Sequence, residues 1–166
     1  MLVLLNMKSL PHEQQMDITQ LMKTYFDHEK LDVYQDALIF VKWASEIIKN
    51  FQDRTVVRDH LDRSSISIVL NIAEGNGKSS IKDRCRYFEI ARASAFECAA
   101  SLDILQAKNI VTPEIVAEGK EHLHRIISRL IKLNQSLMNR VAEESQSYQV
   151  DEKENENEQE NGKHLD

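Results

Sequence analysis

The sequence predicts an all-α protein that folds as an up-down antiparallel four-helix bundle. The 166 residues include only 4 glycines and 2 prolines, which is too little turn material for many short strands. Apolar residues recur with helical spacing over four long segments. Short turns join these segments, and short connections favour antiparallel neighbours. A chain of this length is expected to form one domain with its own core.

Three parts of the chain differ in composition. Residues 1–29 form a leader of mixed polarity, in which Pro11 can start a short helix. Residues 30–142 carry the four-helix bundle. Residues 143–166 form a tail with nine acidic residues and two lysines, so the remainder of the chain is nearly neutral. The tail has too few apolar residues to offset the entropy of ordering it, and we expect it to be disordered.

The first expected helix begins at Asp32, which with Gln35 makes an Asp-x-x-Gln capping signal. One apolar face runs from Tyr34 to Ile48. A second apolar stripe lies beside it and consists of Phe40, Trp43, Ile47 and Phe51. One core cannot easily cover both stripes, and a surface patch of several large apolar side chains usually marks an interface. We therefore expect the second stripe to join copies of the chain in a homo-oligomer.

The second expected helix can be capped by Asp53 or Thr55 and carries an apolar stripe along its length. Gly75 and Gly77 can adopt the left-handed conformation that ends a helix. We expect the second helix to stop at these glycines.

The third expected helix can be capped by Ser79 or Ser80 and runs to about Lys108. Small side chains are frequent over residues 91–101, and they permit two helix backbones to approach closely. The pair Thr112-Pro113 then supplies an N-cap and a proline at the first position of the fourth helix.

Two polar residues, Asn71 and Glu74, stand near the end of the otherwise apolar second helix. A buried carboxylate needs a charged partner or several hydrogen-bond donors. Arg92 on the third helix can supply that charge, as can Arg63 or Arg58. We interpret Asn71, Glu74 and Arg92 as a structural polar network, with a binding role as the alternative.

No set of residues makes a catalytic, cofactor or metal site. The run from Gly75 to Ser80 contains Gly-Lys-Ser, but a phosphate-binding loop needs a glycine at the position of Ile72 and a preceding strand. Glu121 and His124 form one Glu-x-x-His, whereas a di-iron bundle needs a second copy and two further inward glutamates. We therefore expect a protein that is not an enzyme and holds no cofactor or metal.

The cysteines and the apolar segments indicate the cellular compartment of the protein. Cys85 and Cys98 lie roughly 20 Å apart along one expected helix, too far to pair with each other. The opening residues lack the features of a secretory signal, and no segment reaches the ~18 apolar residues that span a bilayer. We expect a cytoplasmic protein without a membrane partner.

Basic residues carry the functional hypothesis. The cations expected to contact phosphates, on the third and fourth helices, are Lys78, Lys82, Arg84, Arg86, Arg125, Arg129 and Lys132. Of the last three, only Arg125 has a favourable local acid, Glu121 one turn earlier. Repetition around an oligomer would turn these cations into a field that attracts nucleic acid, although in one protomer they can equally be a solvated face. We further hypothesise that the acidic tail competes for this face at a high effective concentration.

The segment from Arg63 to Gly75, which ends in Asn-Ile-Ala-Glu-Gly, resembles the second helix of a known family. That family is the four-helix-bundle proteins encoded within intervening sequences of bacterial 23S ribosomal RNA genes. Residues 31–37 resemble its first-helix opening, and residues 87–97 resemble its third-helix pattern. The resemblance covers about residues 31–141.

This resemblance implies a ring-like homopentamer. A related branch of the family serves as the accessory protein of diversity-generating retroelements, so RNA, DNA or a reverse transcriptase are the implied partners. We predict a non-enzymatic homo-oligomeric bundle that binds nucleic acid or a nucleoprotein partner through its basic faces. The alternative is a scaffold or protein-interaction adaptor that makes no contact with nucleic acid.

Overall fold

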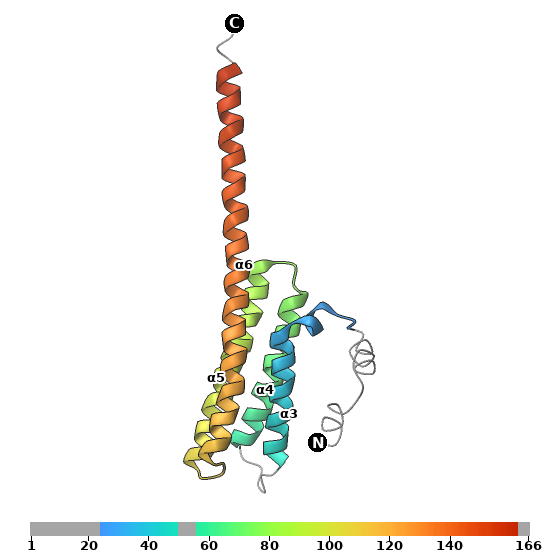
Figure 1. Ribbon diagram of the computed structural model, residues 1–166, viewed down its shortest axis with the longest axis vertical. Helices are drawn as coiled ribbons and strands as arrows, with labels where there is room; N and C mark the ends of the chain where they lie inside the picture. The colour runs from blue at the N-terminus through green and yellow to red at the C-terminus, as the bar shows by residue number, and fades with distance from the viewer. Residues whose placement is uncertain (1–23, 50–55, 163–166) are drawn as a thin grey trace, which may run out of the picture.

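The computed structural model describes residues 24–49 and 56–162, which form four α-helices and one short 3-10 helix. In the labels of Figure 1, the elements are η2 (Asp27–Lys30), α3 (Asp32–Lys49), α4 (Val56–Gly77), α5 (Ile81–Ala107) and α6 (Pro113–Gly162). Both α3 and α5 pack against α4 and α6, and successive helices run in opposite directions. The predicted four-helix bundle is confirmed.

Two predicted helix starts are confirmed. Ser80 is the N-cap of α5, and its hydroxyl accepts a hydrogen bond from the backbone N–H of Asp83. Pro113 is the first residue of α6, where its missing N–H leaves no hydrogen bond unmade. The caps predicted at Asp53 or Thr55 lie outside the described residues, as does nearly all of the leader.

Helix α4 ends at Gly77, as predicted. The predicted left-handed conformation is wrong, because no described glycine has a positive φ. Gly75 is buried within α4, where a Cβ atom would come 2.8 Å from the Phe88 ring of α5. Glycine therefore serves close helix packing at this position. The left-handed residue is Asn109 after the end of α5, with φ 55°, and asparagine tolerates this conformation better than most residues.

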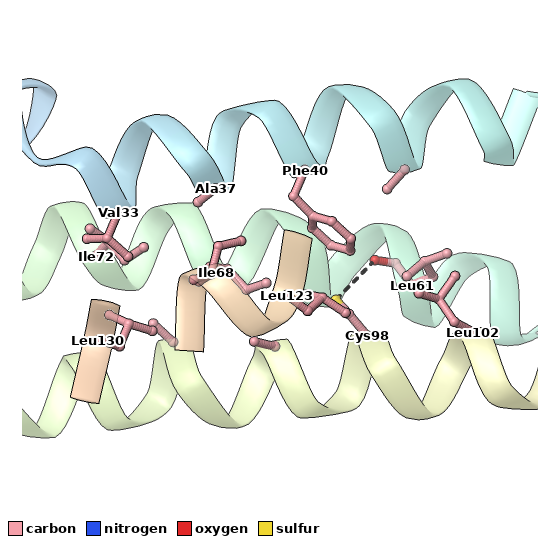
Figure 2. Packing of buried hydrophobic residues seen from close by; sticks show 14 of the residues in the cluster. Val33, Ala37, Phe40, Leu61, Ile68, Ile72, Cys98, Leu102, Leu123 and Leu130 are labelled. Carbon is pink, nitrogen blue, oxygen red and sulfur yellow. Dashed lines mark hydrogen bonds between the residues drawn. The ribbon is translucent and has the colours of Figure 1, made fainter. Parts of the chain in front are cut away.

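The core consists of apolar side chains from all four helices (Figure 2). Large side chains that are fully buried include Phe40, Leu61, Ile68, Ile72, Phe88, Leu102, Leu105, Leu123, Ile126 and Leu130. Ala91, Ala95 and Cys98 of α5 are also fully buried, and these small side chains let α4 and α5 approach closely, as predicted. Burying each large side chain contributes about 1.5–3 kcal/mol. This core positions the surface residues described below.

The second apolar stripe of α3 is largely covered within the subunit. Phe40 is 0% exposed in the core, so its assignment to an oligomer interface is wrong. Trp43 and Ile47 are partly buried and pack against the core. The indole lies over Gly119 of α6, where a Cβ atom would come 2.5 Å from Trp43 Cη2. A glycine on α6 thus makes room for this stripe, and Phe51 lies outside the described residues.

The acidic tail differs from the disordered segment that we expected. Helix α6 continues to Gly162 and projects well beyond the other three helices (Figure 1). Glutamate, glutamine and lysine are frequent in this segment and are good helix formers. A segment that extends an existing helix also avoids the cost of nucleation. Composition alone gave the wrong expectation because it ignored the helix to which the tail is attached.

Candidate nucleic-acid interface

The turn between α4 and α5 gathers four of the seven cations that we expected to contact phosphates. This group, called the basic corner below, consists of Lys78, Lys82, Arg84 and Arg86. Tyr87 lies between two of its members: Lys78 Nζ is 4.8 Å and Arg86 Cζ is 5.1 Å from the centroid of the Tyr87 ring. Two cations thus contact the same aromatic ring, and the face of such a ring attracts positive charge.

Glu74 joins this cluster as an exposed carboxylate. Its Oε1 lies 3.1 Å from Lys78 Nζ, and its side chain is 51% exposed. Hydrogen bonds from Tyr87 and from Lys78 lower the pKa of the Glu74 carboxyl. The same hydrogen bond with Glu74 raises the pKa of Lys78. Both groups are therefore charged near neutral pH.

Arg84 crosses the turn and links the two helices. Its terminal guanidinium nitrogen donates to Asn76 Oδ1 at 3.2 Å, and its Nε is buried without a partner among the described residues. Lys82 is exposed. Two acids, Glu74 and Asp83, accompany the four cations between residues 74 and 86, so the corner keeps a net positive charge. It can attract phosphate groups.

Arg125 and Arg129 of α6 form ion pairs with acids of α3, whereas we expected them to be available for phosphates. Arg125 Nε lies 3.3 Å from Asp36 Oδ1, and Glu121, its expected partner, is not the residue that it contacts here. Arg129 Nη1 lies 2.6 Å from Asp32 Oδ2, and its Nε lies 2.9 Å from Asp36 Oδ2 without the geometry of a hydrogen bond. These ion pairs tie α6 to α3. Acids of α3 that are distant in the sequence therefore neutralise both arginines.

Lys132 belongs to a second location, at the α3–α6 seam. An open cavity of about 540 Å³ lies there, lined by Leu31, Asp32, Val33, Arg129, Lys132, Leu133 and Ser136. Lys132 itself is exposed. The seven predicted cations thus divide between two helix pairs, four at the α4–α5 turn and three on the α3 side of α6. They do not form one continuous face.

The predicted polar network of Asn71, Glu74 and Arg92 is also wrong. The Asn71 amide donates to the Ser67 carbonyl at 2.8 Å and contacts the Ser67 hydroxyl at 3.1 Å. Glu74 turns to Lys78 and Tyr87, as described above. Arg92 pairs with Glu89 one turn earlier on α5. Asn71 and Arg92 thus contact residues one turn away on their own helices, whereas Glu74 contacts Lys78 of the turn and Tyr87 of α5.

Polar side chains also meet between α4 and α5, in a seam that the sequence analysis did not predict. Ser64 Oγ donates to Glu97 Oε2 at 2.8 Å, and the hydroxyls of Ser67 and Ser94 lie 2.9 Å apart. His60 Nε2 lies 3.6 Å from the same Glu97 oxygen. A nucleophilic serine would need to bond the imidazole, whereas Ser64 bonds the carboxylate. The serines that recur with helical spacing on both helices could have indicated this seam. Their hydrogen bonds join α4 to α5.

Other surface features bear on assembly and chemistry. Ile66 and Leu70, one turn apart on α4, are exposed, as is Leu38 on α3. Within the described ranges, no three His, Cys, Asp or Glu side chains group in a way that could hold a metal ion. The helices of those same ranges include none with the length and apolar character needed to cross a membrane.

Comparison with known proteins supports the family expected from sequence. Residues 29–132 match the family described as "23S rRNA-intervening sequence protein". A search of curated proteins found no match. Among solved structures, a protein of unknown function from the S23 ribosomal protein family of Bacteroides thetaiotaomicron is similar, with 26% identity and a TM-score of 0.59. That match covers 61% of this chain and 97% of the other.

Proposed function

The chain belongs to the 23S rRNA-intervening sequence protein family, and we propose that it is a non-enzymatic, homo-oligomeric binding protein of the cytoplasm. Its partner is nucleic acid or a nucleoprotein, held through phosphate contacts at the basic corner. The observation that carries this proposal is the gathering of four cations on nine residues, 78–86, around an exposed turn.

The basic corner suits phosphate for two physical reasons. Lys82 is an exposed ammonium, and Arg86 presents a guanidinium beside Tyr87 that can bond two phosphate oxygens at once. The corner also surrounds the N-terminus of α5, whose helix dipole and free amides favour anions. Neither feature reads a base, so the contacts are independent of sequence.

The site is narrower than the one expected from sequence. Arg125 and Arg129 already hold Asp32 and Asp36, and a phosphate would have to displace those carboxylates. We therefore assign the α6 arginines to bundle stability. Lys132 remains available at the α3–α6 seam as a secondary contact.

We propose that copies of the chain assemble as the family resemblance implies, with a pentamer as the expected ring. Exposed apolar side chains support such an assembly, and they include Ile66 and Leu70, one turn apart on α4, and Leu38 on α3. These residues replace the Phe40 stripe as candidate interface residues. The mass in solution tests the assembly: a value near five times 19.2 kDa agrees with a pentamer, and a monomer refutes it.

Charge reversal tests the basic corner. We expect Lys82→Glu with Arg86→Glu to weaken binding of a labelled RNA or DNA oligonucleotide to a similar extent for every sequence. The affinity should fall steeply between ~50 and ~200 mM salt, and each lost contact should reduce the salt slope by about one. Lys42→Glu with Lys49→Glu, both exposed on α3, gives the same change in net charge as a control. An equal loss in the control would mean that net charge, and not this corner, drives binding.

A protein-interaction adaptor is the second candidate function, and the exposed apolar residues of α3 and α4 favour it. Pull-down with nuclease treatment separates the two. A partner that stays bound after nuclease digestion supports the adaptor, whereas one that is released supports binding through nucleic acid.

A further inference from the structure

Two aromatic side chains stand exposed at the end of the bundle where α3 begins. Tyr25 is 74% and Phe26 is 63% exposed, although large aromatic side chains usually bury most of their surface. We call this pair the aromatic ledge. The helix η2 that follows it packs against both α3 and α4.

The backbone of the aromatic ledge is fixed by hydrogen bonds. Glu29 Oε2 accepts from the N–H groups of Tyr25 at 2.7 Å and Phe26 at 3.2 Å. These two bonds lower the pKa of the Glu29 carboxyl, which is therefore ionised near neutral pH. Gln35 of α3 in turn donates to the Glu29 carbonyl at 2.8 Å. The ledge is thus anchored to the first helix of the bundle.

The ring of Phe26 is also oriented. Phe26 stacks on His28 with centroids 5.7 Å apart and an interplanar angle of 11°. His28 meets the edge of Tyr34 at 4.8 Å and 71°. One face of Phe26 is therefore occupied by the imidazole, and the ring is held ready for a further planar group. Such preorganisation lowers the entropy cost of binding.

The aromatic ledge and the basic corner share one end of the bundle. The start of α3 lies beside the end of α4, with Val33 next to Ile72 in the core (Figure 2), and η2 sits at this end in Figure 1. The end of α4 leads directly into Lys78, and Arg84 reaches back to Asn76 in its last turn. Cations and exposed rings therefore flank the same helix end.

We propose that this end of the bundle binds single-stranded nucleic acid, whose phosphates contact the basic corner and whose unpaired bases stack on Tyr25 and Phe26. The proposal rests on the function proposed above and adds the class of ligand. A cationic groove next to aromatic rings is how proteins hold single strands, because every base has a face that can stack. Bases in a duplex are already stacked on one another and do not offer these faces.

Binding of a 20-nucleotide uridine oligonucleotide, compared with a duplex of equal length, tests this inference on the full chain by fluorescence anisotropy. We expect Tyr25→Ala and Phe26→Ala each to weaken single-strand binding by roughly tenfold, the effect of losing one stacked base. Duplex binding and the salt slope should stay the same, because no charge changes. Phe26→Trp should retain the affinity. Phe96→Ala is the matched control, since Phe96 is a 56% exposed ring on α5 outside the aromatic ledge.

The outcomes separate this inference from the proposed function. If Lys82→Glu with Arg86→Glu weakens binding but the two alanine variants bind both ligands like the parent, the stacking inference is overturned and the proposed function stands. Equal losses for single strand and duplex in the alanine variants also overturn it. If neither oligonucleotide binds the parent protein, the proposed function itself fails.

Discussion

Gly119→Ala tests whether Trp43 is a packing residue of the subunit. The added Cβ would lie 2.5 Å from Trp43 Cη2, 2.9 Å from Trp43 Cζ3 and 2.6 Å from Leu102 Cδ1. Carbon atoms in good contact stay about 3.5–4.0 Å apart. Both neighbours must therefore move by about 1 Å. Leu102 is fully buried on α5, so we expect the larger movement from the indole of Trp43 on α3, which is only partly buried.

The expected cost follows from two opposing effects. Overpacking of a filled site costs about 1–3 kcal/mol, whereas alanine is favoured over glycine inside a helix by about 1 kcal/mol. The net destabilisation of Gly119→Ala is then about 0–2 kcal/mol. Gly77→Ala is the matched control, because no atom lies within 4 Å of its added Cβ and its φ is not positive. It should stabilise by up to about 1 kcal/mol, so the difference between the two variants isolates the packing cost.

Thermal unfolding and intrinsic fluorescence measure the two effects. A net loss of 1 kcal/mol should lower the melting temperature by about 4 °C for a domain of this size. Trp43 is the single tryptophan of the chain, so a shift of its emission to longer wavelength reports its movement toward water. If Gly119→Ala raises the melting temperature as much as Gly77→Ala and leaves the emission unchanged, Trp43 does not occupy this groove. The second stripe of α3 would then again be a candidate oligomer interface.

Three further predictions follow from the same structure. Asp36→Asn should destabilise the bundle by about 1–2 kcal/mol in calorimetry, because it weakens two charged contacts that remain partly open to water. It should also tighten RNA binding by releasing Arg125, whereas Arg129 keeps its contact with Asp32, and an unchanged affinity would exclude Arg125 from the site. Deletion of residues 143–166 should tighten binding at ~50 mM salt and do so less at ~200 mM, because the acids of the α6 extension repel phosphates and salt screens this repulsion; equal affinities at low salt would mean that the tail does not oppose binding. Burial raises the pKa of Cys98 to about 12, so iodoacetamide at pH 8 should label Cys85 first, and equal labelling rates by mass spectrometry would contradict that burial.

The fold was predictable because its signals are local. Helical periodicity, the Ser80 cap and Pro113 at the start of α6 each depend on residues within a few positions of one another. Gly75 shows the limit of such signals. A glycine near a helix end indicates a cap, but here it makes room for Phe88 of the neighbouring helix, and that need is visible only once two helices are packed.

The candidate site was harder to predict because charge pairing depends on which helix faces which. Arg129 has no acid one turn away on its own helix, so the sequence suggested an unpaired cation; the antiparallel packing of α3 brings Asp32 and Asp36 to it. The four cations of the basic corner do lie together, because they are close in the sequence and remain close in any fold that keeps the turn. The aromatic ledge went unnoticed because periodicity does not report the exposure of Tyr25 and Phe26.

Because only four of the seven cations lie at the basic corner, the salt dependence of affinity can show how many corners of an oligomer contact one strand. One basic corner offers three or four phosphate contacts, which predicts a slope of log affinity against log salt of about −2 to −3 on a single strand, or roughly a 16- to 64-fold loss between 50 and 200 mM. A strand that engages two corners of an oligomer should double that slope. The slope measured with a 10-nucleotide and a 40-nucleotide oligonucleotide therefore counts the corners in contact. If the longer strand gives a steeper slope, protomers pool their corners around a shared strand; if the slopes are equal, each corner binds alone and assembly contributes nothing to the charge that the strand meets.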